Sequence, residues 1–186
     1  MKYLYIVRHA KSSWDQVALD DFERPLTDRG HRNAIMLGKL LKEQKIIPDL
    51  LLSSPATRAA MTARLISEQI KYSASDIIFD PKIYLASTPL LFDILRKLKN
   101  EHKQVMIVGH NPGMTALVNE LAVEQVSNLP TCSIYGLRLK IKAWSELSKK
   151  CGQKILYEYP KKVGGIINEG TEGHRDKGTK KKQSDS

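Results

Sequence analysis

Short apolar runs alternate with amphipathic segments four times between residues 3 and 121, and this alternation most constrains the fold. Each run is rich in leucine, isoleucine or valine and is short enough to be a buried strand. Each following segment has apolar residues at helical spacing, as Leu91, Ile94, Leu95 and Leu98 do. The predicted strands are residues 3–7, 50–53, 77–79 and 104–108, and the predicted helices are residues 28–44, 55–70, 91–98 and 117–121.

Repeated strand–helix units favour an α/β fold, a three-layer α/β/α sandwich around a mainly parallel sheet. Two later runs, residues 133–141 and 155–159, alternate apolar and polar residues and predict an antiparallel pair at one edge. Pro55 is predicted at the first position of the second helix, where proline is favoured. We expect one domain over residues 1–160. Residues 161–186 are rich in glycine, lysine and serine and predict a disordered tail.

The formal net charge is +10, and it favours anionic ligands. Residues 161–186 hold seven Lys/Arg and four Asp/Glu, so +3 lies in the tail and +7 in the domain. No stripe of basic residues with interleaved aromatics occurs, so a nucleic-acid partner is not expected. Cys132 and Cys151 form no disulfide framework, and no apolar stretch is long enough for a membrane span. We expect a cytoplasmic monomer without a membrane partner.

Conspicuous polar residues follow three of the predicted strands. Arg8 and His9 follow the first, Arg58 lies in the helix after the second, and His110 follows the fourth. In parallel sheets these carboxyl ends meet at one edge, where ligands bind. Each residue alone has a structural explanation, such as a surface arginine or a packed histidine. Together they suggest a phosphoryl site, because arginine forks match phosphate oxygens and an anion offsets clustered cations.

Four motifs carry a family resemblance. They are Arg8-His9-Ala10, Leu26-Thr27-Asp28-Arg29-Gly30, the block from Ser53 to Ala63, and Val108-Gly109-His110. In this order they resemble the Arg-His-Gly, Leu-Thr-x-x-Gly, Ser-Ser-Pro-x-x-Arg-Ala-x-x-Thr-Ala and second-histidine motifs of the histidine phosphatase superfamily, which has a phosphoglycerate-mutase-like fold. The absence of a large insertion between Arg58 and His110 is similar to the SixA-type phosphohistidine phosphatases.

The resemblance implies that His9 is a nucleophile that forms a phosphohistidine intermediate, and that Arg8, Arg58 and His110 bind the phosphate. It implies no cofactor and no metal. Ala10 stands where the family has glycine, and Asp15 stands where many relatives have asparagine. No carboxylate occurs in residues 81–92, where relatives that act on alcohol esters carry an acid.

Asp15, Asp21 and Ser12, on the loop after the first strand, are therefore auxiliary candidates. Either aspartate could assist the leaving group or simply cap the loop. The expected substrate is a protein that carries phosphohistidine. The alternatives are a small phosphate ester, and, in another class, a non-catalytic module that binds a phospholigand or nucleic acid.

Overall fold

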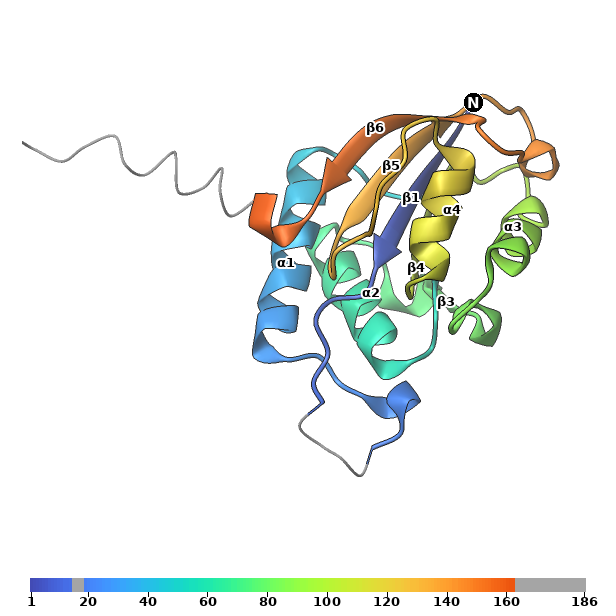
Figure 1. Ribbon diagram of the computed structural model, residues 1–186. Coiled ribbons are helices and arrows are strands. Elements are labelled where there is room, and N and C mark those ends of the chain that lie inside the picture. Colours follow the sequence, from blue (N-terminus) through green and yellow to red (C-terminus); the bar gives the residue numbers. More distant parts are fainter. Residues whose placement is uncertain (15–18, 163–186) are drawn as a thin grey trace, which may run out of the picture.

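A computed structural model describes residues 1–14 and 19–162, which form one six-stranded sheet between two layers of helices (Figure 1). The strands are β1 (Lys2–Arg8), β2 (Leu50–Ser53), β3 (Ile78–Phe79), β4 (Gln104–Gly109), β5 (Ile134–Leu139) and β6 (Gly152–Glu158). The helices are α1 (Asp28–Glu43), α2 (Thr57–Gln69), α3 (Thr88–Arg96) and α4 (Gly113–Leu121), with 3-10 turns η1 (Asp21–Glu23), η2 (Ala74–Asp76), η3 (Pro81–Ile83) and η4 (Trp144–Glu146).

The strand order is β3-β2-β4-β1-β5-β6, and the first four strands run parallel. β5 pairs antiparallel with β1, and β6 pairs antiparallel with β5. The predicted mainly parallel sheet with an antiparallel edge is therefore confirmed. In the β1–β4 register, Arg8 lies opposite Gly109, so the residues that follow, His9 and His110, leave the sheet at the same edge.

Alternate residues of the central strands enter two separate cores. Leu4 and Ile6 of β1 pack in the core on the side of α3 and α4, whereas Tyr5 and Val7 pack in the core beneath α1 and α2. Burial on both faces explains why β1 is a continuous apolar run without alternation. Figure 1 shows the two helical layers on opposite faces of the sheet.

The elements differ from the predictions at their ends. The prediction that Pro55 occupies the first helical position is wrong, because α2 begins at Thr57 with Ala56 as its N-cap. The hydroxyl of Ser54 accepts a hydrogen bond from the amide of Ala56 at 3.2 Å and so stabilises this turn. α3 ends at Arg96, before Leu98, and the loop after β1 contains η1.

Asp15 and residues 163–186 of the predicted tail lie outside the described residues, whereas its first two residues, Lys161 and Lys162, belong to a helical turn that follows β6. Within residues 1–14 and 19–162, no helix is long and apolar enough to cross a membrane.

Candidate active site

His9, His110 and Arg58 meet in one cleft at the carboxyl edge of the sheet. His9 follows β1, His110 follows β4, and Arg58 lies in the first turn of α2. The ring centroids of the two histidines are 5.1 Å apart, and all three side chains are buried. Arg8 and Ser12 also line this cavity, which has a volume of about 390 Å³. The convergence expected from the strand order therefore occurs.

One hydrogen bond fixes the tautomer of His9. Its Nδ1 lies 2.7 Å from the carbonyl oxygen of Ala10. A carbonyl can only accept, so Nδ1 carries the proton and Nε2 of a neutral ring keeps its lone pair. The amide of Ala10 donates to the hydroxyl of Thr62, which in turn donates to the carbonyl of Arg58. Thr62, in the Ser53–Ala63 block, thus links the turn after His9 to the helix that carries Arg58.

Both histidines are uncharged at neutral pH. The pKa of His9 is lowered to about 4, mainly by burial. The hydrogen bond to Ala10 acts to raise this pKa, and the charges of Arg58, Arg8 and Arg24 lower it further. Burial, followed by the proximity of His9 and Arg58, lowers the pKa of His110 to about 3, although Asp21 acts in the opposite direction. A neutral imidazole is the nucleophilic form, so no separate base is needed to deprotonate it.

Two buried nitrogen atoms in the cleft have no hydrogen-bond partner among the described residues. They are Nε of Arg8 and Nδ1 of His110. The other polar atoms of these side chains are partly used, since Arg8 Nη1 donates to the carbonyl of Leu129 at 2.6 Å and His110 Nε2 lies 2.8 Å from the hydroxyl of Ser54. Buried polar groups are normally satisfied, so these two atoms leave hydrogen-bonding capacity unused on two residues that line the cleft.

Asp21 organises the opposite wall of the cleft. Its carboxylate forms ion pairs with Arg58 and Arg24, each at 2.8 Å, and accepts a hydrogen bond from the hydroxyl of Tyr84 at 2.8 Å. Burial acts to raise the pKa of Asp21, but the hydrogen bonds from Tyr84, Arg24 and Arg58 outweigh it and lower that pKa. Asp21 is therefore ionised at neutral pH. It can position the arginines, but it has no proton to give to a leaving group.

Of the auxiliary candidates, Asp21 and Ser12 lie in the cleft, and Asp15 falls outside the described residues. Ser12 accepts a hydrogen bond from Arg24 at 2.8 Å. Sequence reasoning missed Arg24 and Tyr84, which are placed by loops and carry no periodic signal. It also gave Ser54 no role, although its place after a strand and before a proline marked it as a turn residue. No cluster of three metal-ligating side chains occurs in residues 1–14 and 19–162.

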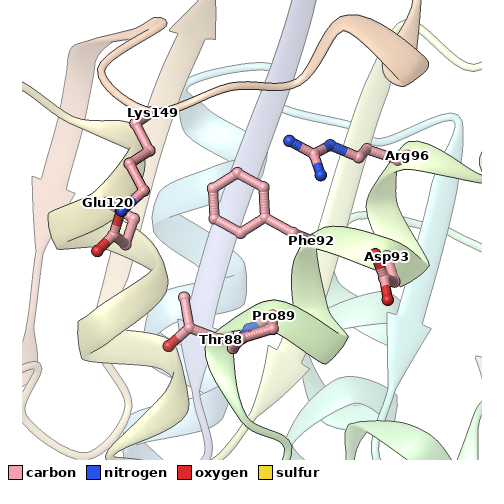
Figure 2. A pocket seen from close by; sticks show the side chains of 7 residues that line it. All are labelled: Thr88, Pro89, Phe92, Asp93, Arg96, Glu120 and Lys149. Atoms are coloured by element: carbon pink, nitrogen blue, oxygen red, sulfur yellow. The ribbon is translucent and has the colours of Figure 1, made fainter.

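A second hollow, of about 300 Å³, lies between α3 and α4 and is separate from this chemistry (Figure 2). Phe92 lies in its middle, with Arg96 above it and the Glu120–Lys149 ion pair on the other wall. It contains no histidine and none of the predicted site residues. We therefore assign the chemistry to the cleft at the strand ends.

Comparisons with known proteins show what the whole chain is similar to. The profile of the histidine phosphatase superfamily, branch 1, matches residues 4–83. The phosphohistidine phosphatase SixA of Escherichia coli strain K12 is 28% identical over 131 residues, which cover 70% of this chain and 80% of SixA. A chloroplast protein of Arabidopsis thaliana is 29% identical over 151 residues, which cover 77% of this chain and 69% of that protein.

Solved structures are similar over nearly their whole length. The protein histidine phosphatase SixA in complex with tungstate matches with a TM-score of 0.75 at 25% identity, over 87% of this chain and 99% of that one. A SixA of Agrobacterium tumefaciens matches with a TM-score of 0.73 at 26% identity, over 86% and 98%.

The profile of the histidine phosphatase superfamily thus matches the first part of the chain, and the described residues have the phosphoglycerate-mutase-like fold of the solved histidine phosphatases. These similarities support a hydrolase of the phosphatase class, and the chain is similar to the SixA phosphohistidine phosphatases.

Proposed function

We propose that this phosphatase removes the phosphoryl group from phosphohistidine in a protein, with His9 as the nucleophile. The observation that carries the proposal is the tautomer of His9. Its Nδ1 is held by the carbonyl of Ala10, so the lone pair on Nε2 is left for phosphorus, in a cleft that also holds Arg8 and Arg58.

The first step forms a bond from Nε2 of His9 to phosphorus and breaks the bond from phosphorus to the substrate's imidazole nitrogen. The substrate ring first takes a proton from solvent on the nitrogen that is not bonded to phosphorus, so it leaves with the bonding electron pair as neutral imidazole. In the second step water attacks the phosphorus of the phosphorylated His9. Inorganic phosphate leaves, and His9 returns with its lone pair. Arg8 and Arg58 stabilise the charge on the equatorial oxygens in both steps.

His110 contributes a hydrogen-bond donor as a neutral ring. The hydroxyl of Ser54 accepts from the amide of Ala56, and its own proton is available for Nε2 of His110. Nδ1 of His110 then carries the ring proton, and this is the buried atom without a partner. A phosphate oxygen supplies the acceptor.

Trapping the intermediate tests the proposal. Wild-type protein mixed with a protein carrying labelled phosphohistidine and quenched in base should retain label in an acid-labile form. His9→Ala should retain none and should not turn over, whereas His31→Ala, which changes a histidine of α1 outside the cleft, should label normally. Turnover by His9→Ala, or label on a residue other than His9, would contradict the assignment of the nucleophile.

A further inference from the structure

Three exposed apolar side chains surround the mouth of the polar cleft. Trp14 is 70% exposed, Leu85 56% and Phe22 39%. Eight large apolar side chains are exposed in the described part of the chain, and three of these eight lie at or beside this one cavity. Trp14 and Leu85 line the cavity, and Phe22 packs edge-on against Tyr84, next to Leu85, at 5.0 Å. We refer to Trp14, Phe22 and Leu85 as the apolar collar.

The collar is fixed relative to the phosphate site. The Tyr84 ring, against which Phe22 packs, lies 5.4 Å from the ring of His110. On the other side, the guanidinium of Arg24 lies 3.2 Å from the centre of the Trp14 ring. Tyr84 and Arg24 both bond to Asp21. One carboxylate therefore ties both halves of the collar to the side chains of the cleft.

Leu85 is unfavourable for the fold in two ways. Its φ of 48° lies in the left-handed region, which costs a residue other than glycine or asparagine free energy. More than half of its side chain also remains in water. An asparagine would suit this backbone better and would expose less apolar surface, so the leucine side chain has little use within the chain itself. Backbone outliers of this kind gather at ligand sites.

We infer that the apolar collar binds the protein surface around the substrate's phosphohistidine, and so selects phosphorylated proteins over small phosphate esters. This inference rests on the proposed function. The collar side chains remain largely exposed, whereas most of the other residues that line the cavity are arginines, histidines and other polar residues. A small ester bound through its phosphate stays within that cavity. A macromolecular surface that delivers a phosphohistidine to His9 must cover the collar.

Charge completes the description of the partner. Lys11 is exposed at the cleft, and the chain carries +10 overall. The complementary surface has apolar residues next to the phosphohistidine and acidic residues farther out, because opposite potentials steer association. Aromatic rings such as those of Trp14 and Phe22 contribute strongly when a partner surface buries them, and the burial of Leu85 adds apolar area.

The test compares two substrates with a P–N bond. One is phosphoramidate, which has no organic body, and the other is a histidine-containing protein phosphorylated with phosphoramidate. We expect Leu85→Asn combined with Phe22→Ser to lower kcat/KM for the protein about tenfold or more, mainly through KM. Hydrolysis of phosphoramidate should change less than about twofold, because Phe22 does not line the cavity and Leu85, which lines it, has no polar side-chain atom to bind the phosphoryl group. Trp14 stays unchanged because its ring contacts Arg24.

Matched variants separate binding from damage. Val123→Ser removes an apolar side chain that is 72% exposed and does not line the cleft, so it should leave both rates unchanged. Leu85→Met keeps the apolar surface and should retain the rate on the protein. Leu85→Asn fits the left-handed backbone, so its melting temperature should not fall.

Four outcomes would overturn the inference. Two are an unchanged kcat/KM for the protein substrate and an equal decrease of kcat/KM for both substrates. The third is a decrease confined to a long-chain alkyl phosphate used as a third substrate. The fourth is a wild-type dimer in sedimentation that Leu85→Asn dissociates. A wild-type protein that hydrolyses neither P–N substrate would instead contradict the proposed function, so the two failures are distinguishable.

Discussion

At the scale of single residues, the cleft keeps two histidines uncharged beside three arginines. His9 and His110 are buried, and protonating either ring would add a cation where Arg8, Arg24 and Arg58 already concentrate positive charge. The low pKa values therefore serve the proposed chemistry, because the lone pair of His9 is present at all pH values near neutral. They also have a consequence for stability.

Stability should fall as the pH falls through the range between the unfolded and folded histidine pKa values. In the unfolded chain each histidine titrates near its ordinary value of about 6.5, whereas in the folded chain the pKa is about 4 for His9 and about 3 for His110. Between pH 6.5 and 4 the unfolded state therefore binds more protons, and acidification favours it. Each histidine contributes up to about 1.4 kcal/mol per pH unit there.

Urea unfolding between pH 7 and 5 measures this slope. The range stays above the ordinary pKa of carboxylates, so histidines dominate it. His9→Gln and His110→Gln should each reduce the slope, and the double variant should reduce it most. A wild-type free energy of unfolding that stays constant over this range would contradict the burial of the two uncharged rings.

Replacing Arg58 should slow phosphoenzyme formation far more than replacing an exposed arginine of the same helix. It is buried, with its guanidinium at the cleft, so its loss removes a fixed charge from the phosphoryl group. Arg58→Ala should slow phosphoenzyme formation by about 10²–10³, as should Arg8→Ala, and the double variant should lose less than the product of the two. Rapid-quench labelling measures the rate.

Arg64→Ala is the matched control for Arg58, because Arg64 is an exposed arginine one to two turns further along α2. It should label at the wild-type rate. Tungstate should raise the melting temperature of wild type and of Arg64→Ala, and it should do so less for Arg58→Ala. Equal stabilisation of all three proteins would place the anion elsewhere.

At the scale of elements, the start of α1 supports the turn that follows His9. The carbonyl of Lys11 accepts a hydrogen bond from the amide of Thr27 at 2.9 Å and lies so close to Gly30 that a Cβ there would overlap it. Thr27 in turn caps α1 by accepting from the amide of Gly30. The Leu-Thr-x-x-Gly motif thus has a physical reason, because only glycine leaves room for the backbone two residues after His9.

Gly30→Ala should therefore lower both stability and activity. Alanine gains about 1 kcal/mol of helix propensity, but displacing a backbone carbonyl costs about 1–3 kcal/mol. The shift is transmitted to His9, so phosphoenzyme formation should slow by up to about 10²-fold. Gly38→Ala is the control. Its Cβ would lie 2.8 Å from that of Gln69 in the α1–α2 contact, so it should lower the melting temperature but leave the labelling rate unchanged.

The elements were largely predictable, and the walls of the cleft were not. Strand and helix periodicity predicted the layers, and the shared direction of parallel strands predicted that His9, Arg58 and His110 converge. Tyr84 and Arg24 come from loops whose paths depend on tertiary contacts, including their common bond to Asp21. The position of Pro55 was missed for a similar reason, since the Ser54 side chain determines how α2 begins.

At the scale of the whole molecule, residues 1–14 and 19–162 carry the cleft within a single α/β unit. The segment from β3 to β4, residues 80–103, has η3 and α3 as its only helical elements, so it adds no further domain over the strand ends. Residues 81–92 contain no carboxylate, and Asp21 is ionised in its ion pairs. Among the described residues that line the cleft, none is a carboxylic acid ready to protonate a leaving group.

This lack of an acid predicts the substrate preference. A sugar or glycerate alkoxide needs a proton as it leaves, and a general acid typically contributes about 10²–10⁴ in rate to such a step. Imidazole leaves from phosphohistidine as a stable neutral base whose conjugate acid has a pKa of about 6.5, so it needs little help. We expect kcat/KM to be highest for a phosphohistidine protein, intermediate for an aryl phosphate with a good leaving group, and lowest for sugar phosphates.

Replacing Asp15 or Asp21 tests whether either aspartate protonates the leaving group. Asp15→Asn and Asp21→Asn should have small effects on phosphohistidine cleavage, because that leaving group requires no protonation by a carboxylic acid. For Asp21 the remaining effect should come from Arg58, which loses an ionic partner but keeps its bond to the backbone carbonyl of residue 21. A sugar phosphate that proved the fastest substrate, with one of these aspartates indispensable for it, would mean that the protein is a small-molecule phosphomonoesterase with its own general acid.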